Sequence, residues 1–513
     1  GAEEGKWSCA EKYSILCDSL RYADVKEEAL RLLDLAVEKG SGYWYGKQEE
    51  FLEKFWEGCA IEISGDEELN LSLHFSQYGL LQSAGLDGVS NIGAKGLSGE
   101  GYEGHYFWDT EMYMLPFFSL TQPEVARKLL GYRYHILDQA RENAVKMGHP
   151  KGALFPWRTI NGKECSYYYP SGGAQYHIIG DITYGIIQYY LITGDWDYIV
   201  EQGAEIVMET ARIWYDLGNF YKGKFHIHDV TGPDEYTCVV NNNYYTNLTA
   251  KHNLIWAAKL YEKLKEKGQL EKLQDKIGIT ESEITGFKTA AEAMYLPYDE
   301  ELDINPQDDS FLSKKVWDMA SIPEGAGPLM QRNFLYHIYR YQVCKQADTV
   351  LAHFLFEDEQ ELSTIRNSFE YYEKITTHDS SLSRCIFSII AAKLGEKEKA
   401  YQYFDFSSKT DINNSQKNTK DGIHTANMGG TYMAVVYGFL GLRVKEGGFF
   451  FRPILPDEWN GIRLDLCLRG SRIEINADRD QCRFSLKKGD PVEIHVYDEV
   501  YELSDEITVE MRG

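Results

Sequence analysis

The feature that most constrains this chain is an alternation of apolar, helix-length segments with polar loops, which runs from about residue 71 to residue 444. Many of the segments are apolar around most of their circumference, a pattern typical of helices that pack on two sides. About twelve helices fit in this stretch, which suits a double ring of inner and outer helices. The sequence therefore predicts a mainly helical (α/α)6 barrel. Representative segments are "ITYGIIQYYLITG", "FLYHIYRYQVCKQADTVLAHFLF", "LSRCIFSIIAAKLG" and "TYMAVVYGFLGLR".

The two ends of the chain differ in pattern from this middle part. Between about Glu27 and Trp56 the apolar residues recur at helical spacing, which predicts two helices in a linker region spanning residues 1–70. After Arg443 short segments alternate polar and apolar residues between turn signals. We therefore expect the barrel to span residues 71–444 and a small antiparallel β domain to span residues 445–513.

Composition narrows the function classes. The formal net charge is −26, from 53 Lys and Arg against 79 Asp and Glu. An acidic chain without a basic stripe argues against nucleic acid or an anionic membrane as a partner. The nine cysteines are scattered singly without a CxxC pair, as expected of reduced thiols in the cytoplasm. No apolar run is long enough to cross a bilayer.

The stretch "GYEGHYFWDTEMYMLP", residues 101–116, combines aromatic and acidic side chains. Trp108 beside Asp109 suits a sugar, because an aromatic face packs on a sugar ring while a carboxylate accepts from its hydroxyls. The structural alternative is a helix start whose aromatic residues fill the core. A metal site from His105, Asp109 and Glu111 has suitable atoms, but no second ligand cluster supports it. We therefore assign His105 and Glu111 to support and predict no metal.

A second loop, "DVTGPDEYTCVVNNNYYTN", holds two adjacent acids after a Gly-Pro turn, Asp234 and Glu235. Adjacent acids raise one pKa, and a partly desolvated glutamic acid is the usual proton donor to a glycosidic oxygen. The Asn-rich part that follows is also a typical helix cap.

Two more loops each precede a predicted helix. One helix is expected to start at about Ser381, after His378 and Ser380, and the other near Thr431, after His424 and a glycine pair. Each would offer backbone N–H groups and an imidazole at the positive end of a helix dipole. One such loop is weak evidence, but two in one chain with a candidate glycosidic acid point to inorganic phosphate. The P-loop form is absent, so ATP is not expected.

A fifth segment, "KQADTV", places Lys345 and Gln346 inside an apolar helical run. Either the lysine snorkels to the rim, or the two polar side chains contact a bound sugar.

Together these motifs resemble glycoside hydrolase family 65, which consists mainly of inverting disaccharide phosphorylases acting on maltose, trehalose, kojibiose or nigerose. The matching stretches are "GYEGHYFWDTE", "GPDEY…NNNYYTN", "KQAD", "HDSSLS" and "DGIHTANMGG", in the family's order over about residues 101–441. The resemblance implies the same (α/α)6 barrel and C-terminal β domain, and no cofactor beyond phosphate as co-substrate.

The resemblance also implies roles for individual residues. Glu235 would be the general acid; the substrate would be held by Trp108, Asp109, Lys345, Gln346 and, near the acceptor sugar, Glu164; phosphate would be bound by Ser380, Ser381, His424, Gly429 and Gly430.

This sequence departs from the family pattern in two respects. Thr237 stands where many members have histidine, at the border of the acceptor site. The family also carries a large N-terminal β-sandwich that is absent from this chain, either because the sequence is a fragment or because the protein lacks that domain. The candidate protein partners are therefore a second copy of this chain or a separate β-sandwich domain.

The expected reaction is a single displacement on an α-linked glucose disaccharide, giving β-glucose 1-phosphate. An inverting hydrolase would need a second carboxylate to activate water, for which Glu373, Asp379 and Asp421 are candidates. Because their loops also carry the residues suited to phosphate, the sequence favours phosphorolysis. A non-catalytic carbohydrate-binding protein is a third reading, but it would have no use for a proton donor. The sequence does not fix the linkage.

Overall fold

The structure is a computed structural model that describes residues 7, 9–166, 169 and 171–512. The chain divides into two units, Gly1–Ala60 and Ile61–Gly513. In the first unit, α1 (Val25–Cys59) starts where the Asp24 side chain accepts from the Glu27 N–H at 2.9 Å. Gly40, with φ of 75° and ψ of 162°, breaks α1 into two halves. These halves are the two helices predicted for this region.

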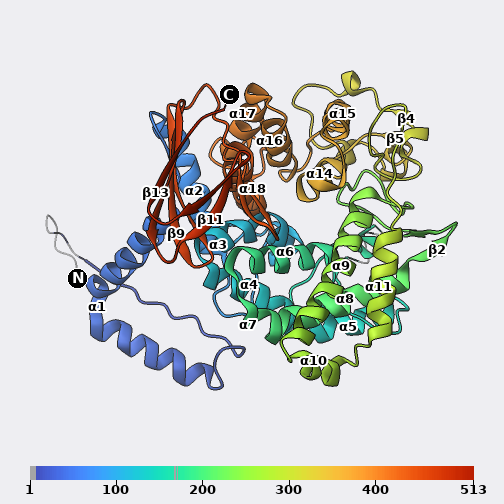
Figure 1. Ribbon diagram of the computed structural model, residues 1–513. Coiled ribbons are helices and arrows are strands. Elements are labelled where there is room, and N and C mark those ends of the chain that lie inside the picture. Colours follow the sequence, from blue (N-terminus) through green and yellow to red (C-terminus); the bar gives the residue numbers. More distant parts are fainter. Residues whose placement is uncertain (1–6, 8, 167–168, 170, 513) are drawn as a thin grey trace. The chain divides into compact units, whose positions relative to one another are not determined.

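The second unit is built mainly of helices (Figure 1). They are α2 (Glu67–Ser83), η1 (Gly101–Gly104), η2 (Thr110–Met114), α3 (Leu115–Thr121), α4 (Pro123–His135), α5 (Leu137–Lys146), η3 (Gly172–Ala174), α6 (His177–Thr193), α7 (Trp196–Tyr198), η4 (Ile199–Gly203), α8 (Ala204–Leu217), α9 (Tyr244–Glu266), α10 (Leu270–Ile277), α11 (Glu281–Ala293), η5 (Phe311–Ser313), η6 (Met319–Ser321), α12 (Leu329–Arg332), α13 (Leu335–Ile338), α14 (Thr349–Leu355), η7 (Glu357–Glu359), α15 (Leu362–Glu373), α16 (Ser383–Lys393), α17 (Lys397–Ser408), η8 (Thr419–Asp421), α18 (Thr425–Met433) and η9 (Ala434–Phe439).

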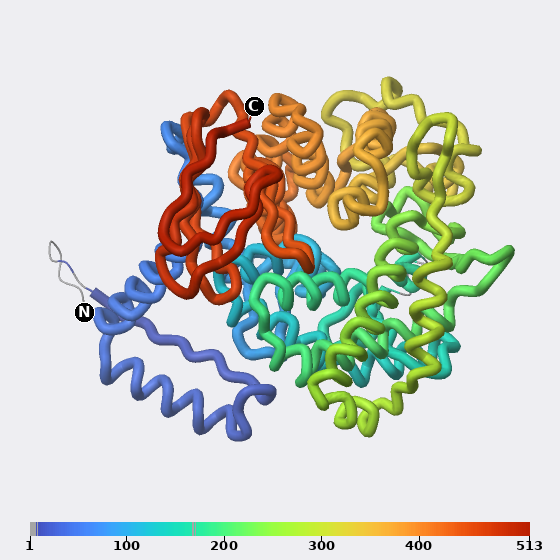
Figure 2. The backbone as a smooth tube through the Cα atoms, viewed as in Figure 1, coloured from blue at the N-terminus to red at the C-terminus, as the bar shows by residue number. Residues whose placement is uncertain are grey.

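The inner helices form a closed ring. In chain order α3, α6, α9, α14, α16 and α18 each contact the next, and α18 returns to η2 and α3. Figure 2 shows this closure where the orange segment of α18 meets the cyan segment of α3. The outer helices α4, α8, α11, α15, α17 and α2 pack on this ring. The predicted (α/α)6 barrel is therefore confirmed, and the core lies between its two shells.

One predicted helix is wrong. The apolar run from Phe334 to Phe356 is not a single helix but α13, a short strand β5 (Tyr341–Gln342), a loop and then α14. The loop leaves the helical path because its polar groups bond to the loop that carries Glu235, as described below.

The C-terminal part forms two sheets. One has the order β1-β8-β9-β10-β13 and the other β12-β11-β7-β6. The β7–β11 pair is parallel, so the second sheet is mixed and not purely antiparallel as predicted. Among the described residues no strand precedes β1. The strands are β1 (Glu62–Ile63), β2 (Asn219–Tyr221), β3 (Lys224–His226), β4 (Lys315–Val316), β6 (Arg443–Lys445), β7 (Gly448–Phe451), β8 (Gly461–Leu468), β9 (Ser471–Asp478), β10 (Gln481–Lys488), β11 (Val492–Val496), β12 (Glu499–Leu503) and β13 (Glu506–Glu510).

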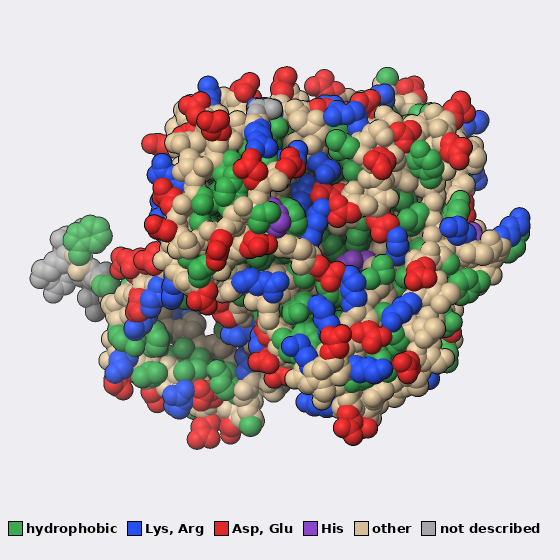
Figure 3. All heavy atoms as spheres, viewed as in Figure 1, with side chains coloured by type: hydrophobic (Ala, Val, Ile, Leu, Met, Phe, Trp, Pro, Cys, Tyr) green, Lys and Arg blue, Asp and Glu red, His purple; other side chains and the backbone are tan. Residues whose placement is uncertain are grey.

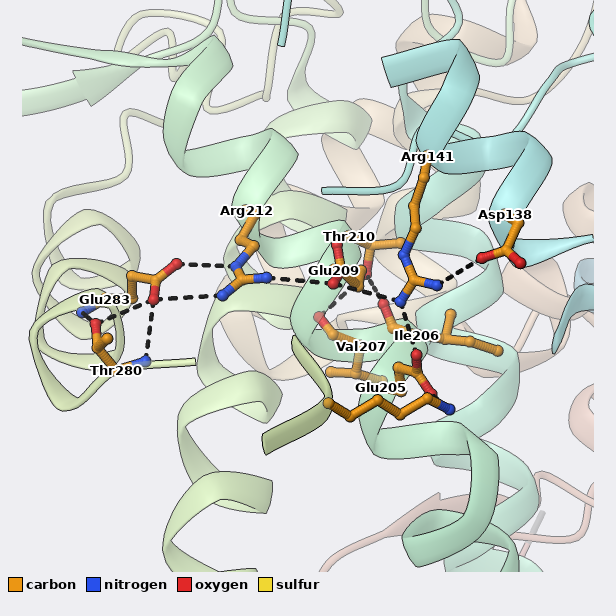
Figure 4. Close-up of polar contacts among 11 residues, drawn as sticks. Asp138, Arg141, Glu205, Ile206, Val207, Glu209, Thr210, Arg212, Thr280 and Glu283 are labelled. Carbon is orange, nitrogen blue, oxygen red and sulfur yellow. Dashed lines mark hydrogen bonds and ion pairs between the residues drawn. The ribbon is translucent and has the colours of Figure 1, made fainter. Parts of the chain in front are cut away.

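An ion-pair network ties α5 to the outer helices α8 and α11 (Figure 4). Arg141 of α5 bonds to Glu205 of α8 at 2.7 Å. Arg212, also on α8, bonds to Glu283 of α11 at 2.8 Å. Glu205 is almost fully buried, and its carboxylate also pairs with Lys276 Nζ at 2.5 Å, so its buried charge is compensated from two sides. The network therefore braces the outer shell away from the loops considered below.

The surface agrees with the acidic composition. Figure 3 shows acidic and basic side chains interspersed over the face in view, without a continuous basic patch there. Within the described ranges, no helix has the length and apolar character that a bilayer crossing requires.

Candidate active site

Trp108 and Asp109 precede η2, at the start of an inner helix. Trp108 is only 3% exposed, and its ring packs edge-on against Tyr113, His177 and Tyr245. A sugar platform needs an open ring face, so this packing does not agree with the predicted stacking role for Trp108. Asp109 is half-buried and keeps part of its surface accessible to solvent. Burial raises the pKa of Asp109 to about 7, and the nearby Glu235 carboxylate adds to the rise.

The neighbours of Asp109 hold this segment in place. Arg133 donates from Nε and Nη2 to the two oxygens of Glu111, both at 2.7 Å, and from Nη2 to the Phe107 carbonyl at 3.0 Å. His105 lies with Nδ1 2.9 Å from the Tyr102 carbonyl oxygen. Among the described residues no group of three or more His, Cys, Asp or Glu is placed to hold a metal ion. Glu111 thus orients the segment through a buried ion pair.

Glu235 lies in the loop between β3 and α9, which contains no helix, as the sequence predicts. Its side chain is 15% exposed, and its Oε2 accepts from Lys345 Nζ at 2.6 Å. The following helix α9 starts at the Asn cap that the sequence suggests, where Asn243 Oδ1 accepts from the Thr246 N–H at 2.8 Å. The acid therefore sits on a loop anchored directly to an inner helix.

Asp234, the neighbour of Glu235, is fully buried and serves as an acceptor. Its Oδ1 accepts from the Lys345 N–H at 2.6 Å, and its Oδ2 accepts from Gln307 Nε2 at 3.0 Å. Burial raises the pKa of Asp234 to about 6. Because its oxygens are occupied by protein donors, Asp234 fixes the loop and is poorly placed to donate to a substrate.

A second buried acid, Asp348, continues this network. Its Oδ2 accepts from the Asp234 N–H at 3.2 Å, and its Oδ1 accepts from Asn243 Nδ2 at 3.1 Å. Burial raises the pKa of Asp348 well above its ordinary value. A Cβ on Gly232 would lie 2.4 Å from Asp348 Oδ2. Only glycine fits at the turn before the two acids.

Lys345 and Gln346 lie in the loop between β5 and α14 that replaces the predicted helix. Lys345 reaches the candidate acid through Nζ. Gln346 is 4% exposed, and its Nε2 donates to the Pro233 carbonyl at 2.5 Å. One N–H of its amide is therefore bonded to the acid loop, and its predicted sugar contact stays a prediction.

The acid loop is also joined to the first predicted phosphate loop. Tyr236 Oη donates to Asp379 Oδ2 at 2.5 Å, and the same oxygen accepts from the Leu329 N–H at 2.7 Å. Tyr236 follows Glu235 directly, and Asp379 precedes Ser380 directly. The bridge therefore places the candidate acid and the candidate phosphate-binding serines on two loops that are locked together.

In that phosphate loop the helix α16 starts at Ser383, slightly later than predicted. Ser380 and Ser381 are half-buried, and Ser380 Oγ accepts from the Leu382 N–H at 3.3 Å. His378 lies with Nδ1 2.8 Å from Ser383 Oγ. Burial lowers the pKa of His378 to about 3, so its ring is neutral near pH 7 and supplies no positive charge for an anion.

His424 occupies the N-cap position of α18. Asp411 holds it twice: its Oδ1 lies 2.6 Å from Nδ1 of the ring, and its Oδ2 accepts from the His424 N–H at 3.0 Å. The other ring nitrogen, Nε2, is buried and has no hydrogen-bond partner among the described residues. A buried polar atom without a partner is costly, so an incoming ligand atom at Nε2 would be stabilised.

The glycine pair does not form a loop before a helix, and this prediction is wrong. Gly429 and Gly430 lie inside α18, which starts at Thr425 and not near Thr431. A Cβ on Gly429 would lie 2.1 Å from the Tyr113 carbonyl oxygen, and one on Gly430 would lie 2.5 Å from Cys385 Sγ. These glycines let three inner segments pack closely. Their amides belong to the helix and do not agree with the predicted phosphate cradle.

Glu164 stabilises its own loop. Its Oε2 accepts from the Trp157 N–H and its Oε1 from the Ser166 N–H, both at 2.7 Å. Its predicted place near the acceptor sugar stays a prediction.

The structure thus brings Asp109, Glu235 and Lys345 within electrostatic reach of one another. The loop that carries Ser380 and Ser381 is linked to the Glu235 loop by the Tyr236–Asp379 hydrogen bond. The helix α18 packs on the backbone of Tyr113, four residues after Asp109. Sequence reasoning missed Asp348, Gln307 and Asp411. Asp348 ends the quoted "KQAD" motif, a signal that could have found it. Gln307 and Asp411 have no local signal.

Comparisons with known proteins agree with this arrangement. The family model described as the glycosyl hydrolase family 65 central catalytic domain matches residues 74–433, and the model of that family's C-terminal domain matches residues 442–503. The α,α-trehalose phosphorylase of Geobacillus stearothermophilus is 54% identical over 98% of this chain and 66% of its own length. The kojibiose phosphorylase of Halothermothrix orenii is 37% identical over 90% of this chain and 62% of its own length.

Comparison with a solved structure leads to the same family. A human-microbiome protein assigned as a kojibiose phosphorylase superposes with a TM-score of 0.89 at 30% identity, covering 96% of this chain and 68% of that one. The chain spans about two thirds of the length of the curated trehalose phosphorylase named above. By its fold, its motifs and these matches, the chain belongs to glycosyl hydrolase family 65.

Proposed function

We propose that this chain carries the catalytic site of an inverting phosphorylase, which cleaves an α-linked glucose disaccharide with inorganic phosphate. The observation that carries the proposal is the bridge between the Glu235 loop and the Ser380 loop through Tyr236 and Asp379. A proton donor and a phosphate-binding loop on adjacent rigid segments are what a single displacement needs.

In the proposed reaction Glu235 protonates the glycosidic oxygen while phosphate attacks C1 of the glucosyl unit from the opposite face. The bond from C1 to the acceptor oxygen breaks, a bond from C1 to a phosphate oxygen forms, and the configuration at C1 inverts to give β-glucose 1-phosphate. The remaining phosphate proton can restore Glu235. Asp109 would accept from glucosyl hydroxyls, and His424 Nε2 with Ser380 and Ser381 would hold the phosphate.

Phosphorolysis is favoured over hydrolysis because the candidate bases are occupied or displaced. Asp379 accepts from Tyr236 and from the Leu329 backbone. Glu373 accepts from Lys399 Nζ at 2.8 Å and from Tyr403 Oη at 2.9 Å. Asp421 is exposed. An inverting hydrolase needs a free carboxylate to activate a water molecule held in the site; Glu373 and Asp379 are already bonded to protein donors, and Asp421 lies exposed to bulk solvent in η8.

Trehalose is the proposed substrate, because a relative 54% identical is named as a trehalose phosphorylase. Purified protein would be given trehalose, kojibiose, nigerose and maltose, each with and without phosphate, and glucose 1-phosphate and glucose would be measured. We expect glucose 1-phosphate from trehalose only when phosphate is present. Equal glucose release in phosphate-free buffer would support the hydrolase instead, and binding without any turnover would support a carbohydrate-binding protein.

A further inference from the structure

The contact between Lys345 and Glu235 poses a problem for acid catalysis. Lys345 Nζ lies 2.6 Å from Glu235 Oε2, and the two side chains are 16% and 15% exposed. A hydrogen bond between charged groups at this distance and with this little solvent is strong. A general acid has to carry a proton, whereas a carboxyl group paired with an ammonium group is held ionised.

The contact with Glu235 keeps Lys345 charged in spite of its burial. Although burial favours the neutral amine, the Glu235 carboxylate raises the pKa of Lys345 above its ordinary value. The backbone of Lys345 is fixed, because its N–H donates to Asp234 at 2.6 Å. The Lys345 ammonium group can therefore leave Glu235 by rotation of its side chain, without a shift of the backbone.

If Lys345 leaves, the nearest ionisable groups that remain beside Glu235 include two carboxyl groups. Asp234 is next to it, and Asp109 is close enough to repel its charge. Like charges at close range disfavour a second ionised carboxyl group. The titratable groups that interact with Glu235 are Tyr102, Asp109, Tyr169, Asp234, Tyr339 and Lys345.

We propose that sugar binding draws the Lys345 ammonium away from Glu235 towards the sugar hydroxyls, and that Glu235 takes up one proton from solvent in the same event. Glu235 would then carry the proton that catalysis needs only when a disaccharide is bound in the site. This inference rests on the proposed function, since it assigns the timing of protonation to the same acid. It also gives Lys345 a role besides its predicted sugar contact.

The test is isothermal titration calorimetry with trehalose in phosphate-free Hepes, ACES and Tris at pH 7.5. The slope of the observed enthalpy against the buffer's ionisation enthalpy counts the protons taken up. We expect the wild-type slope to exceed that of Glu235→Gln by about one proton, because the glutamine cannot titrate. In Lys345→Met the slope should fall towards that of Glu235→Gln, because no ammonium group is left for the sugar to draw away from Glu235. Lys151→Gln, at an exposed position, should match the wild type.

The outcomes separate the two claims. If trehalose is phosphorolysed but wild type and Glu235→Gln give equal slopes, this inference is wrong and the proposed function stands. If Lys345→Met keeps the full wild-type slope, protonation does not depend on the ion pair and the inference is again wrong. If none of the four disaccharides is turned over with phosphate, the proposed function fails and this inference fails with it.

Discussion

The loop that carries Glu235 and the helix end that carries His424 are built in opposite ways. Around Glu235, buried carboxylates accept from the donors that reach them: Asp234 takes the Lys345 and Gln307 donors, and Asp348 takes the Asp234 N–H. At His424 only one side of the ring is satisfied. Asp411 holds Nδ1, while Nε2 is buried without a hydrogen-bond partner among the described residues.

This difference matches two different tasks. A proton donor has to be held in one position relative to the bond it cleaves, so its loop gains from a complete set of internal hydrogen bonds. A site for a small anion needs donors that the protein itself does not use. Substitutions in the first region should therefore affect the chemical step, and substitutions in the second should affect the binding of phosphate.

The largest effect is expected for Glu235→Gln. Loss of the proton donor should lower phosphorolysis of trehalose by about 10³-fold, within the range for general acids. α-Glucosyl fluoride, whose leaving group needs no proton, should lose less than about tenfold under the same principle. Both rates would be measured with phosphate. An equal fall for the two substrates would show that residue 235 binds sugar or maintains the fold and is not the acid.

His424→Asn should act on the other side of the comparison. Removing a buried hydrogen bond to a charged ligand should raise the KM for phosphate by about 10–100-fold while the KM for trehalose changes little. Steady-state kinetics with each substrate varied in turn would measure this. His135→Asn, at an exposed position on α4, is the matched control. A changed trehalose KM with an unchanged phosphate KM would contradict the assignment of His424.

Asp348→Asn tests the rigid region without touching the acid. Asp348 accepts from both the Asp234 N–H and the Asn243 side chain. The new asparagine side chain would replace one accepting oxygen by an NH2 donor facing these donors, so the acid loop should shift. We expect kcat to fall by about tenfold while the phosphate KM is unchanged, because a small displacement of a catalytic group is costly. Asp358→Asn, at an exposed surface ion pair, should behave like the wild type. A loss of thermal stability with an unchanged kcat would show that Asp348 only supports the fold.

The last prediction concerns the effect of Asp109 on stability at different pH values. Burial raises its folded-state pKa to about 7 from 3.8, so the folded protein is penalised when Asp109 ionises. The penalty is absent near pH 4 and grows as the pH rises to about 7. Asp109→Asn should therefore be more stable than the wild type at pH 8, by on the order of 2 kcal/mol, with little difference at pH 4. Denaturant unfolding at both pH values would measure it, and a pH-independent difference would contradict this explanation.

The sequence predicted the fold well because the ring of inner helices depends on local patterns. The apolar run of α6 and the Asn cap of α9 are visible in a few consecutive residues. The acid loop was also predictable, since Gly232, Pro233 and the two acids are adjacent. The structural role of Asp234 could not be predicted, because its hydrogen-bond partners Gln307 and Lys345 are distant in sequence.

The errors have the same physical cause. The glycine pair in α18 resembled an anion-binding loop, but Gly429 exists because the Tyr113 backbone approaches it closely. The apolar neighbours of the "KQAD" run predict a helix there, whereas its polar groups bond to a loop more than 100 residues away. Contacts between distant segments override local pattern at these positions.

The most direct test of the account is the first product released from trehalose, followed by NMR in buffer with and without phosphate. A single displacement assisted by Glu235 predicts β-glucose 1-phosphate as the first glucosyl product, formed only with phosphate. α-Glucose 1-phosphate, or free glucose released at the same rate without phosphate, would contradict it.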